Sequence, residues 1–505
     1  MGMKEIIKLF SEKGILIEPE ALDYISSKDD PISFAQCMIS KFSGSSLVLT
    51  LEEIKKIEHY EEEEGEGEEE KHETKVFEKT PVGTGEKVLA KEYESEVKII
   101  RDVTGNITCK GEVEDFTKLF NSRYSKIKKI FQSQRRALRN SIPIKKIKNG
   151  KIKEAQIIGM VKDIRTTQKG YRIVEIEDEE DSITILVPKD DPRLYQQAQE
   201  IVYDEVISIR ITSGRNGLFI AQSISYPDIS VNHKKNKSDV PVYVAFLSDT
   251  HIGSKKFLKD HWNRLIKWLN GEIGNSRQRD VARKIRYIVI PGDTVDGVGV
   301  YPNQDKELEI SDIYKQYQTL AEELQKIPDH ITIIIQPGNH DAVRPAEPQP
   351  ALEKEIQDLF SGKEFIFVGN PCYFSIHGVE ILSYHGQSLL DFSTSIPTLK
   401  YNQPIDIMKI SLRKRHLAPI YGGHTPIAPE HEDFMVIERI PDIFVTGHVH
   451  LSSIGEYRGV TLINASAWQA QTSYQKMLNF VPDPAKLPIV DLKTGNATSM
   501  DFNVV

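Results

Sequence analysis

The sequence has few cysteines and no long apolar run, and both absences exclude classes of protein. Only three of its 505 residues are cysteine, and they lie far apart, at Cys37, Cys109 and Cys372. Small secreted domains depend on closely spaced cysteines, so a disulfide framework is excluded. No apolar stretch approaches the ~20 residues of a membrane span, and residues 1–4 begin no signal-peptide core. We therefore expect a soluble cytoplasmic protein without a membrane partner.

The sequence also lacks a net positive charge, since its formal charge is −9. That figure hides an uneven distribution. Residues 61–73 hold nine Glu against Lys71 alone, whereas residues 126–153 hold eleven Lys or Arg and no acid. The acidic run is poor in apolar residues up to about Glu96, which predicts a disordered linker over 61–100. Net charge is thus a poor guide to the partners of this chain.

Five short polar clusters carry most of the chemistry that can be recognised. Each follows an apolar, β-branched run of strand length, which indicates a buried strand. An open α/β sheet places its site at the carboxyl ends of its strands, so the five clusters are expected to converge. The clusters are Ser248–His251, Gly292–Asp296, Gly338–Asp341, Tyr384–Gly386 and Gly447–His450.

The residue types in these clusters predict a dinuclear metal centre. Carboxylate and imidazole groups suit Mn²⁺, Fe²⁺ or Zn²⁺, and the absence of nearby cysteine argues against a structural zinc site. Two ions ~3.5–4 Å apart need a shared carboxylate, and they clamp the attacking and leaving oxygens of a displacement at phosphorus. The clusters therefore indicate phosphoester hydrolysis.

The succession D-x-H, G-D-x-x-D, G-N-H-D, H and G-H-x-H resembles the calcineurin-like metallophosphoesterase superfamily. This resemblance implies a β-sandwich flanked by helices over residues 240–505. It also implies that His340 acts beside the metals as a general acid or phosphate clamp, and that the carboxylates of Asp341 and Asp296 hold an imidazole in one tautomer. By the same resemblance, Asp249, His251 and His450 bind one metal, Asn339, His385 and His448 bind the other, and Asp293 bridges them.

Two departures from that superfamily bear on the substrate. Its protein phosphatases carry Arg after the second Asp of the G-D-x-x-D cluster and Arg before Gly-Asn-His. Here those positions are Gly297 and Pro337. Without two guanidinium groups, a phosphomonoester dianion loses its bidentate clamps. The departures favour a diester substrate and hence a nuclease.

The first half of the chain is expected to hold four segments before the phosphoesterase domain. Residues 1–60 have helical spacing and predict a small helical interaction domain, and the linker follows over 61–100. Residues 101–150 form a basic helical segment, in which Lys128, Lys129, Arg135 and Arg136 are candidate DNA contacts. A merely solvated face is the alternative for these cations.

Residues 151–231 predict five short strands with a helix after the third, which suits an OB-fold barrel. Such a barrel binds either a single strand or a protein, and protein binding is favoured here. Beyond it, Arg413, Lys414 and Arg415 form a basic cluster that either grips a DNA backbone or is a surface loop. Residues 465–480 are rich in large apolar groups, including Trp468, and suggest a docking segment.

Sequence runs beside the five polar clusters make the resemblance more specific. From about Arg101 onward, the chain resembles the small subunit of the archaeal D-family DNA polymerase. The resemblance rests on Gly111–Phe116, Ile290–Asp293, Gly338–Arg344 and Arg415–Gly423. It implies a proofreading 3′→5′ exonuclease with two divalent metal ions, chiefly Mn²⁺, with Mg²⁺, Fe²⁺ or Zn²⁺ as alternatives.

The same resemblance implies a large subunit that holds the polymerase site, DNA primer–template and single-stranded 3′ ends as partners, and a place at the nucleoid. A sliding clamp is a further candidate partner for the helical domain. Two other functions stay open. One is a free-standing metal-dependent phosphodiesterase or phosphatase, and the other is a non-catalytic replication scaffold.

Overall fold

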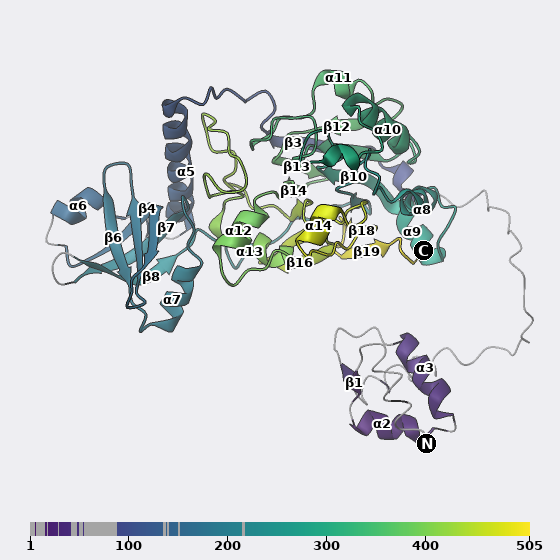
Figure 1. Ribbon diagram of the computed structural model, residues 1–505, viewed down its shortest axis with the longest axis horizontal. Coiled ribbons are helices and arrows are strands. Elements are labelled where there is room, and N and C mark those ends of the chain that lie inside the picture. The colour runs from purple at the N-terminus through teal and green to yellow at the C-terminus, as the bar shows by residue number, and fades with distance from the viewer. Residues whose placement is uncertain are drawn as a thin grey trace, which may run out of the picture. The chain divides into compact units, whose positions relative to one another are not determined.

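The structure is a computed structural model, and it divides the chain into two compact units, residues 1–82 and 83–505 (Figure 1). Most of the acidic linker and the side chains of Arg135, Arg136 and Cys37 lie outside the described part of the chain. The described residues are 6, 16–17, 19–28, 30–41, 48–49, 54, 88–134, 138, 141–149, 152–214 and 218–504.

The described residues of the first unit include two helices and a short parallel strand pair. The Asp30 carboxylate accepts a hydrogen bond from the Ser33 amide at 3.1 Å, so the second helix begins where the Asp-Pro pair predicts. Buried apolar residues such as Ala21, Ile25 and Met38 form its core. The elements are β1 (Leu16–Ile17), α2 (Pro19–Ser26), α3 (Pro31–Lys41) and β2 (Val48–Leu49).

The second unit contains the predicted five-stranded barrel over residues 154–225. Its strands close in the order first, second, third, fifth, fourth, and the helix follows the third strand. This is the arrangement expected of residues 151–231, and alternating Ile and Val side chains fill the barrel. Its elements are β4 (Glu154–Thr166), β5 (Arg172–Glu177), β6 (Ser182–Val187), α7 (Pro192–Gln199), β7 (Val206–Ser213) and β8 (Phe219–Ser225).

The remainder of this unit is an α/β sandwich of two six-stranded sheets. In hydrogen-bonded order, the first sheet contains β12 (Phe365–Phe367), β11 (Thr332–Gln336), β10 (Ile285–Pro291), β9 (Tyr243–Phe246), β18 (Lys486–Asp491) and β19 (Ala497–Asp501). The second contains β16 (Ser453–Tyr457), β17 (Val460–Asn464), β15 (Ile443–Thr446), β14 (Val379–Ser383), β13 (Cys372–Ile376) and β3 (Val97–Asp102). Apolar side chains of both sheets interdigitate between them.

Helices cover the outer faces of both sheets. Trp262, Leu265, Tyr317 and Leu320 pack on the first sheet, and Leu412 with its neighbours packs on the second. The helices of the first face are α8 (Lys259–Leu269), α9 (Ser276–Lys284), α10 (Ile313–Gln325) and α11 (Lys354–Gln357). Those of the second face are α12 (Leu389–Ser395) and α13 (Pro404–Lys414), and short elements elsewhere are η1 (Leu89–Glu92), η4 (Gln304–Lys306) and α14 (Ser473–Met477).

The expected linker boundary at residue 100 is wrong. Residues 97–102 form β3, which pairs antiparallel with β13, at the edge of the second sheet. The partner strand lies more than 250 residues further along the chain, and no local pattern reveals such a pairing. The α/β domain therefore begins before the barrel and resumes after it.

Helix α5 (Val113–Gln134), with the shorter α6 (Ile144–Asn149), follows β3 and lies beside the barrel (Figure 1). The guanidinium of Arg123, which is fully buried, joins three parts of the unit. It donates to the Asp433 carboxylate at 2.7 Å, to the Asp204 carbonyl of the barrel at 2.9 Å and to the Pro419 carbonyl at 2.5 Å. The predicted cationic helix thus has a buried side that fixes the barrel. Lys129 is exposed, and Lys128 lies 3.7 Å from Glu179.

The basic cluster at the end of α13 is buried or half-buried inside the unit, which corrects the DNA contacts expected there. Lys414 and Arg415 are 3% and 2% exposed. The Lys414 ammonium donates to Glu205 at 2.7 Å, and Arg415 donates to the carbonyls of Ile437 and Glu438 at 2.7 Å. Arg413, half-buried, pairs with Glu200 at 2.5 Å. Groups buried in this way cannot neutralise phosphates, because their charges are already paired inside the protein.

Replacing Lys414 by Met should destabilise the protein strongly. It leaves the Glu205 carboxylate buried without its partner, and breaking a buried pair in this way costs about 3–5 kcal/mol. Denaturant unfolding would measure the loss. The matched control is Lys409→Met on the same helix, whose ammonium pairs with Asp406 at the surface and contributes less than about 1 kcal/mol. Equal losses in the two variants would contradict the structural role of Lys414.

Candidate metal centre

The five polar clusters follow strands of both sheets and meet between them. Asp249 and His251 come after β9, Asp293 after β10, and Asn339 after β11. His385 follows β14, and His448 and His450 follow β15. Strands β9, β10 and β11 are parallel to one another, as are β14 and β15, so within each sheet the loops leave at one edge. The predicted convergence is found, with the loops shared between two sheets.

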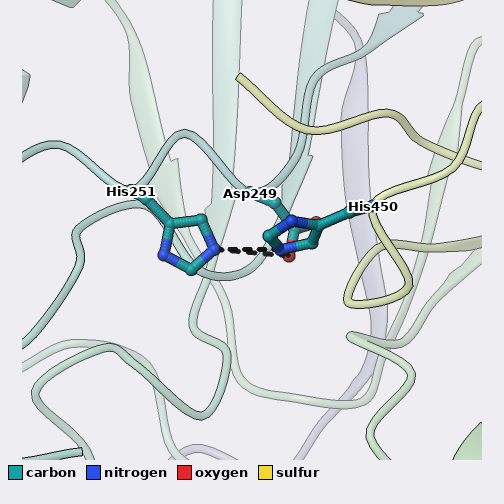
Figure 2. A group of neighbouring side chains, drawn as sticks. All are labelled: Asp249, His251 and His450. Carbon is teal, nitrogen blue, oxygen red and sulfur yellow. Dashed lines mark hydrogen bonds and ion pairs between the residues drawn. The ribbon is translucent and has the colours of Figure 1, made fainter. Parts of the chain in front are cut away.

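Asp249, His251 and His450 form the first group of candidate metal ligands (Figure 2). The Nε2 atoms of the two imidazoles lie 3.1 Å apart, and His450 Nε2 lies 3.3 Å from the Asp249 carboxylate. On its other side, His251 Nδ1 lies 3.1 Å from the Asp296 carboxylate. A carboxylate at this distance favours the proton on Nδ1, which would leave Nε2 to face the other groups.

Asp293, His385 and His448 form the second group. His385 Nδ1 lies 2.9 Å from the Pro291 carbonyl and donates its proton there. Its Nε2 faces the Asp293 carboxylate at 3.3 Å, Asn339 Oδ1 at 3.0 Å and His448 Nδ1 at 3.2 Å. Three polar atoms converge on this nitrogen, and a proton or a metal cation among them would offset their mutual repulsion. The donor set of both groups, imidazole nitrogen and carboxylate or amide oxygen, fits a divalent metal.

Asp293 lies between the two groups. Its Oδ2 atom is 3.3 Å from His385 Nε2 of the second group and 3.9 Å from His251 Nε2 of the first. His340 is a third neighbour, with Nε2 4.0 Å from the same oxygen. The His340 Nδ1 lies 2.7 Å from the Asp296 carbonyl, so that carbonyl fixes the proton on Nδ1 and leaves Nε2 toward Asp293. This position beside the metal ligands agrees with the one implied by the resemblance.

Asp341 does not hold an imidazole, which corrects the expectation for this residue. Its carboxylate accepts hydrogen bonds from the Thr294 hydroxyl and amide, the Gly338 amide at 2.8 Å and the Tyr317 hydroxyl at 3.0 Å. It therefore ties the loop after β10 to the loop after β11. Thr294 and Tyr317 carry no ligand atom, so sequence reasoning had no signal by which to select them.

The ligand loops are held in a conformation that ordinary residues avoid. Asp249, His251, Asp293, His448 and His450 all have positive φ, between 45° and 65°. Non-glycine residues adopt this region at a cost of about 1–3 kcal/mol each, and such residues cluster where a site needs them. The surrounding hydrogen bonds must offset that cost, so the loops are held in place before any ligand binds.

Glycines next to the ligands leave no room for a side chain. A Cβ on Gly338 would lie 2.6 Å from the Asp293 amide nitrogen and 2.7 Å from the His385 ring. A Cβ on Gly447 would lie 2.5 Å from the Asp249 carboxylate. The loops therefore approach one another at backbone distance, which explains the glycine in these two clusters.

The electrostatics of the site combine deep burial with close carboxylates. Burial alone would lower the pKa of His385, but the Asp293 carboxylate outweighs it and raises that pKa to about 10. Asp296 and Asp293 act likewise on His251 and raise its pKa to about 9. Burial lowers the pKa of His340 below its ordinary value, although Asp293 opposes that shift. In the metal-free chain, protons thus occupy the positions that a cation would take.

A cleft of about 590 Å³ opens onto this site. Its polar floor includes His251, Asp293, Asn339, His340 and His450. The aromatic and aliphatic lining includes Tyr301, Tyr401, Tyr474, Leu478 and Phe480. Sequence reasoning selected the segment of the last three, residues 465–480, but missed Tyr301 and Tyr401. It also missed Gln475, whose amide nitrogen lies 3.0 Å from His450 Nδ1. A signal existed for the last residue, because Thr472 and Gln475 form a capping box that is visible as T-x-x-Q.

Comparison with known proteins places the chain in the class of accessory subunits of DNA polymerases. A family model that describes the B subunits of DNA polymerases alpha and epsilon matches residues 244–455, which include the five ligand loops. Similar curated proteins define the family more closely. The chain belongs to the family of archaeal DNA polymerase II small subunits. The one from Methanothermobacter thermautotrophicus is 38% identical over 497 residues, covering 97% of this chain and 98% of the relative.

Two other relatives carry the same description. The DNA polymerase II small subunit of Archaeoglobus fulgidus is 45% identical and covers 78% of each chain. That of Methanocaldococcus jannaschii is 43% identical over 83% of this chain and 71% of its own length. Among solved structures, a novel archaeal phosphodiesterase is 13% identical over 51% of this chain and 99% of its own, with a TM-score of 0.25. No helix among the described residues is long and apolar enough to span a membrane.

Replacing Asp293 by Asn should remove metal from the chain. The carboxylate that lies between both ligand groups becomes a neutral amide, so metal content should fall from two ions per chain to one or none. Elemental analysis of the purified protein after dialysis measures this. Asp305→Asn, at an exposed carboxylate outside the cleft, is the control and should keep the wild-type content. Two ions at full occupancy in Asp293→Asn would contradict the position assigned to it.

Metal affinity should rise with pH between about 6.5 and 10. His251 and His385, with pKa values raised to about 9 and about 10, must release protons before they can bind a metal. The sign is opposite for the metal-free fold, whose imidazolium–carboxylate pairs are fully present below pH 6.5 and lost as the pH rises through those values. Calorimetric titration with Mn²⁺ in buffers of different ionisation enthalpy would count the protons released. Binding that releases none would contradict these shifts.

Proposed function

We propose that this small subunit carries a dinuclear-metal 3′→5′ exonuclease that removes mismatched 3′ ends for the polymerase. The observation that carries the proposal is the arrangement of two ligand groups on either side of Asp293, with His340 beside them on the floor of an open cleft. That arrangement suits hydrolysis of a phosphodiester.

Seven residues would hold the two ions. The first ion would be bound by Asp249, His251 and His450. The second would be bound by Asn339, His385 and His448, and Asp293 would bind both ions. When bound, the ions would lower the pKa of water and neutralise charge on the phosphate. Mn²⁺ is favoured, with Mg²⁺, Fe²⁺ and Zn²⁺ as alternatives for the same donors.

A diester fits the cleft better than a monoester. No arginine or lysine is found among the described residues that line it, and the positions of the phosphatase arginines are Gly297 and Pro337. A monoester dianion would meet only the charge of the metals, without bidentate clamps. This supports a nuclease over a phosphatase acting on small monoesters.

His340 would act as the general acid that protonates the leaving group. Its Nδ1 proton is engaged by the Asp296 carbonyl, so only Nε2 can exchange a proton with a substrate. Protonated at Nε2, it would give that proton to the deoxyribose 3′-oxygen as the bond to phosphorus breaks. Burial lowers the pKa of His340, and the Asp293 carboxylate, 4.0 Å away, opposes that shift.

The partner is the large catalytic subunit of the polymerase, since the chain is a small subunit of that enzyme. Primer–template DNA and single-stranded 3′ ends would be its substrates, in the cytoplasm at the nucleoid. The unit over residues 1–82 would recruit a further replication protein such as a sliding clamp. Lys128 and Lys129 of α5, with Arg135 and Arg136, remain candidates for DNA contacts.

Replacing His340 by Ala should lower hydrolysis by roughly 10²–10⁴-fold while metal content is retained. The substrate is a 5′-labelled primer with a mismatched 3′ end on its template, incubated with Mn²⁺ and followed by stepwise shortening on a gel. EDTA provides the metal-free control, and His261→Ala, on the outer helix α8, provides a histidine control.

No shortening by the wild-type chain, with or without the large subunit, would contradict the exonuclease. Cleavage of small esters alone would then indicate a free-standing phosphodiesterase, and no hydrolysis of either substrate would indicate a scaffold. Full activity in His340→Ala would leave the exonuclease in place and remove His340 from its chemistry.

A further inference from the structure

The cleft has two walls of different chemistry, and only one of them is used by hydrolysis. The floor carries the carboxylates and imidazoles. The other wall consists of the aromatic and aliphatic lining residues Tyr401, Tyr474, Leu478 and Phe480, and the rings of Tyr401 and Phe480 pack with centroids 5.7 Å apart. A metal site alone does not require such a wall. We therefore considered which ligand the residues of this wall could bind.

The rim of this wall is exposed although it is apolar. Tyr474 is 55% exposed and Leu478 is 61% exposed, and both line the cleft. Leaving such side chains in water forgoes the free energy of their burial. Because they border a cleft of small-molecule size, a ligand entering the cleft would cover them.

Helix α14 ties this rim to the metal ligands. Thr472 and Gln475 close its first turn as a capping box, and the Gln475 amide nitrogen also lies 3.0 Å from His450 Nδ1. The Phe480 amide donates to the Gln475 carbonyl at 2.9 Å, which holds the end of the segment on the same helix. The spacing between the aromatic rim and the site of hydrolysis is therefore fixed by direct hydrogen bonds.

The absence of cationic side chains from the described cleft lining indicates which part of a nucleotide the aromatic wall can bind. With no lysine or arginine among the described lining residues, these residues offer the sugar–phosphate backbone no cation of their own. Stacking of a base on an aromatic side chain contributes substantial affinity and works with any base. An exonuclease that removes all four nucleotides needs a contact of this kind, which does not read sequence.

We infer that Tyr474, supported by Leu478 and Phe480, is a stacking subsite for the unpaired terminal base of a single-stranded 3′ end. This rests on the proposed function, because it assigns the base of the nucleotide whose phosphodiester lies at the metal site. A paired base must leave its duplex to reach the subsite, and this costs least at a mismatch. The subsite would therefore favour mismatched ends before any chemistry occurs.

A binding titration with the full chain tests the subsite without hydrolysis. The probe is a single-stranded oligonucleotide with 2-aminopurine at its 3′ end and a phosphorothioate as its last linkage, in Mn²⁺. Stacking should quench its fluorescence, and Tyr474→Ala should weaken binding roughly fivefold to a hundredfold. Tyr474→Phe should keep the quenching. Met477→Ala, on the same helix and 77% exposed but outside the cleft, should bind within twofold of the wild type.

A second probe with an abasic 3′ end tests the base itself. The wild-type chain should bind it as weakly as Tyr474→Ala binds the normal end, and Tyr474→Ala should lose no further affinity for it. Unchanged binding of the normal end by a folded Tyr474→Ala variant would overturn the subsite. The subsite would also be overturned if Tyr474→Ala and Met477→Ala both lost affinity for the large subunit with DNA affinity intact, since α14 would then be a protein contact.

Hydrolysis of bis(p-nitrophenyl) phosphate separates this inference from the proposed function, because that ester carries no base. If neither the ester nor the DNA end is cleaved but quenching still depends on Tyr474, the subsite is supported and the exonuclease fails. If the ester and the DNA end are both cleaved but quenching does not depend on Tyr474, the exonuclease stands and the subsite is overturned.

Discussion

The structure of the α/β domain is constrained by the need to hold several buried hydrogen-bond acceptors close to one another at the candidate metal centre. His385 Nε2 alone is surrounded by a carboxylate, an amide oxygen and a second imidazole within 3.3 Å. Without a proton or a metal cation among them these groups would repel, so they are held from behind. The Pro291 carbonyl and the Asp296 carboxylate hold the rings, and Asp341 joins two of the loops. The positive φ angles and the glycines without room for a Cβ follow from the same requirement.

A second set of buried charges joins the barrel to the α/β domain. The Asp433 carboxylate accepts from Arg123 at 2.7 Å and lies 2.9 Å from His416, and these neighbours hold its pKa far below the ordinary value despite burial. Such pairs contribute little net stability compared with apolar packing, but their geometry admits few alternatives. The barrel is therefore held in one orientation on the domain that carries the cleft.

The sequence was most informative where structure is local. Each ligand loop follows its strand directly, so short apolar runs and turn residues were sufficient to locate Asp249, Asp293 and His385. The five barrel strands were predictable for the same reason. The burial of Lys414 and Arg415 was not predictable, because three consecutive basic residues look the same in sequence on a surface and in a buried interface. The pairing of β3 with β13 and the position of α14 over the cleft depend on contacts between distant segments, which periodicity in one segment cannot report.

The pairing of β3 makes the barrel an insertion within the α/β domain. The chain contributes an edge strand at residues 97–102, leaves to build α5 and the barrel, and returns at β9. The barrel is thus tethered at both ends, which restricts it far more than a single hinge would. A fragment cut between barrel and domain would also lose β3 and expose the backbone of β13, an open edge prone to pairing with other chains. The natural point of division lies before residue 88, not after the barrel.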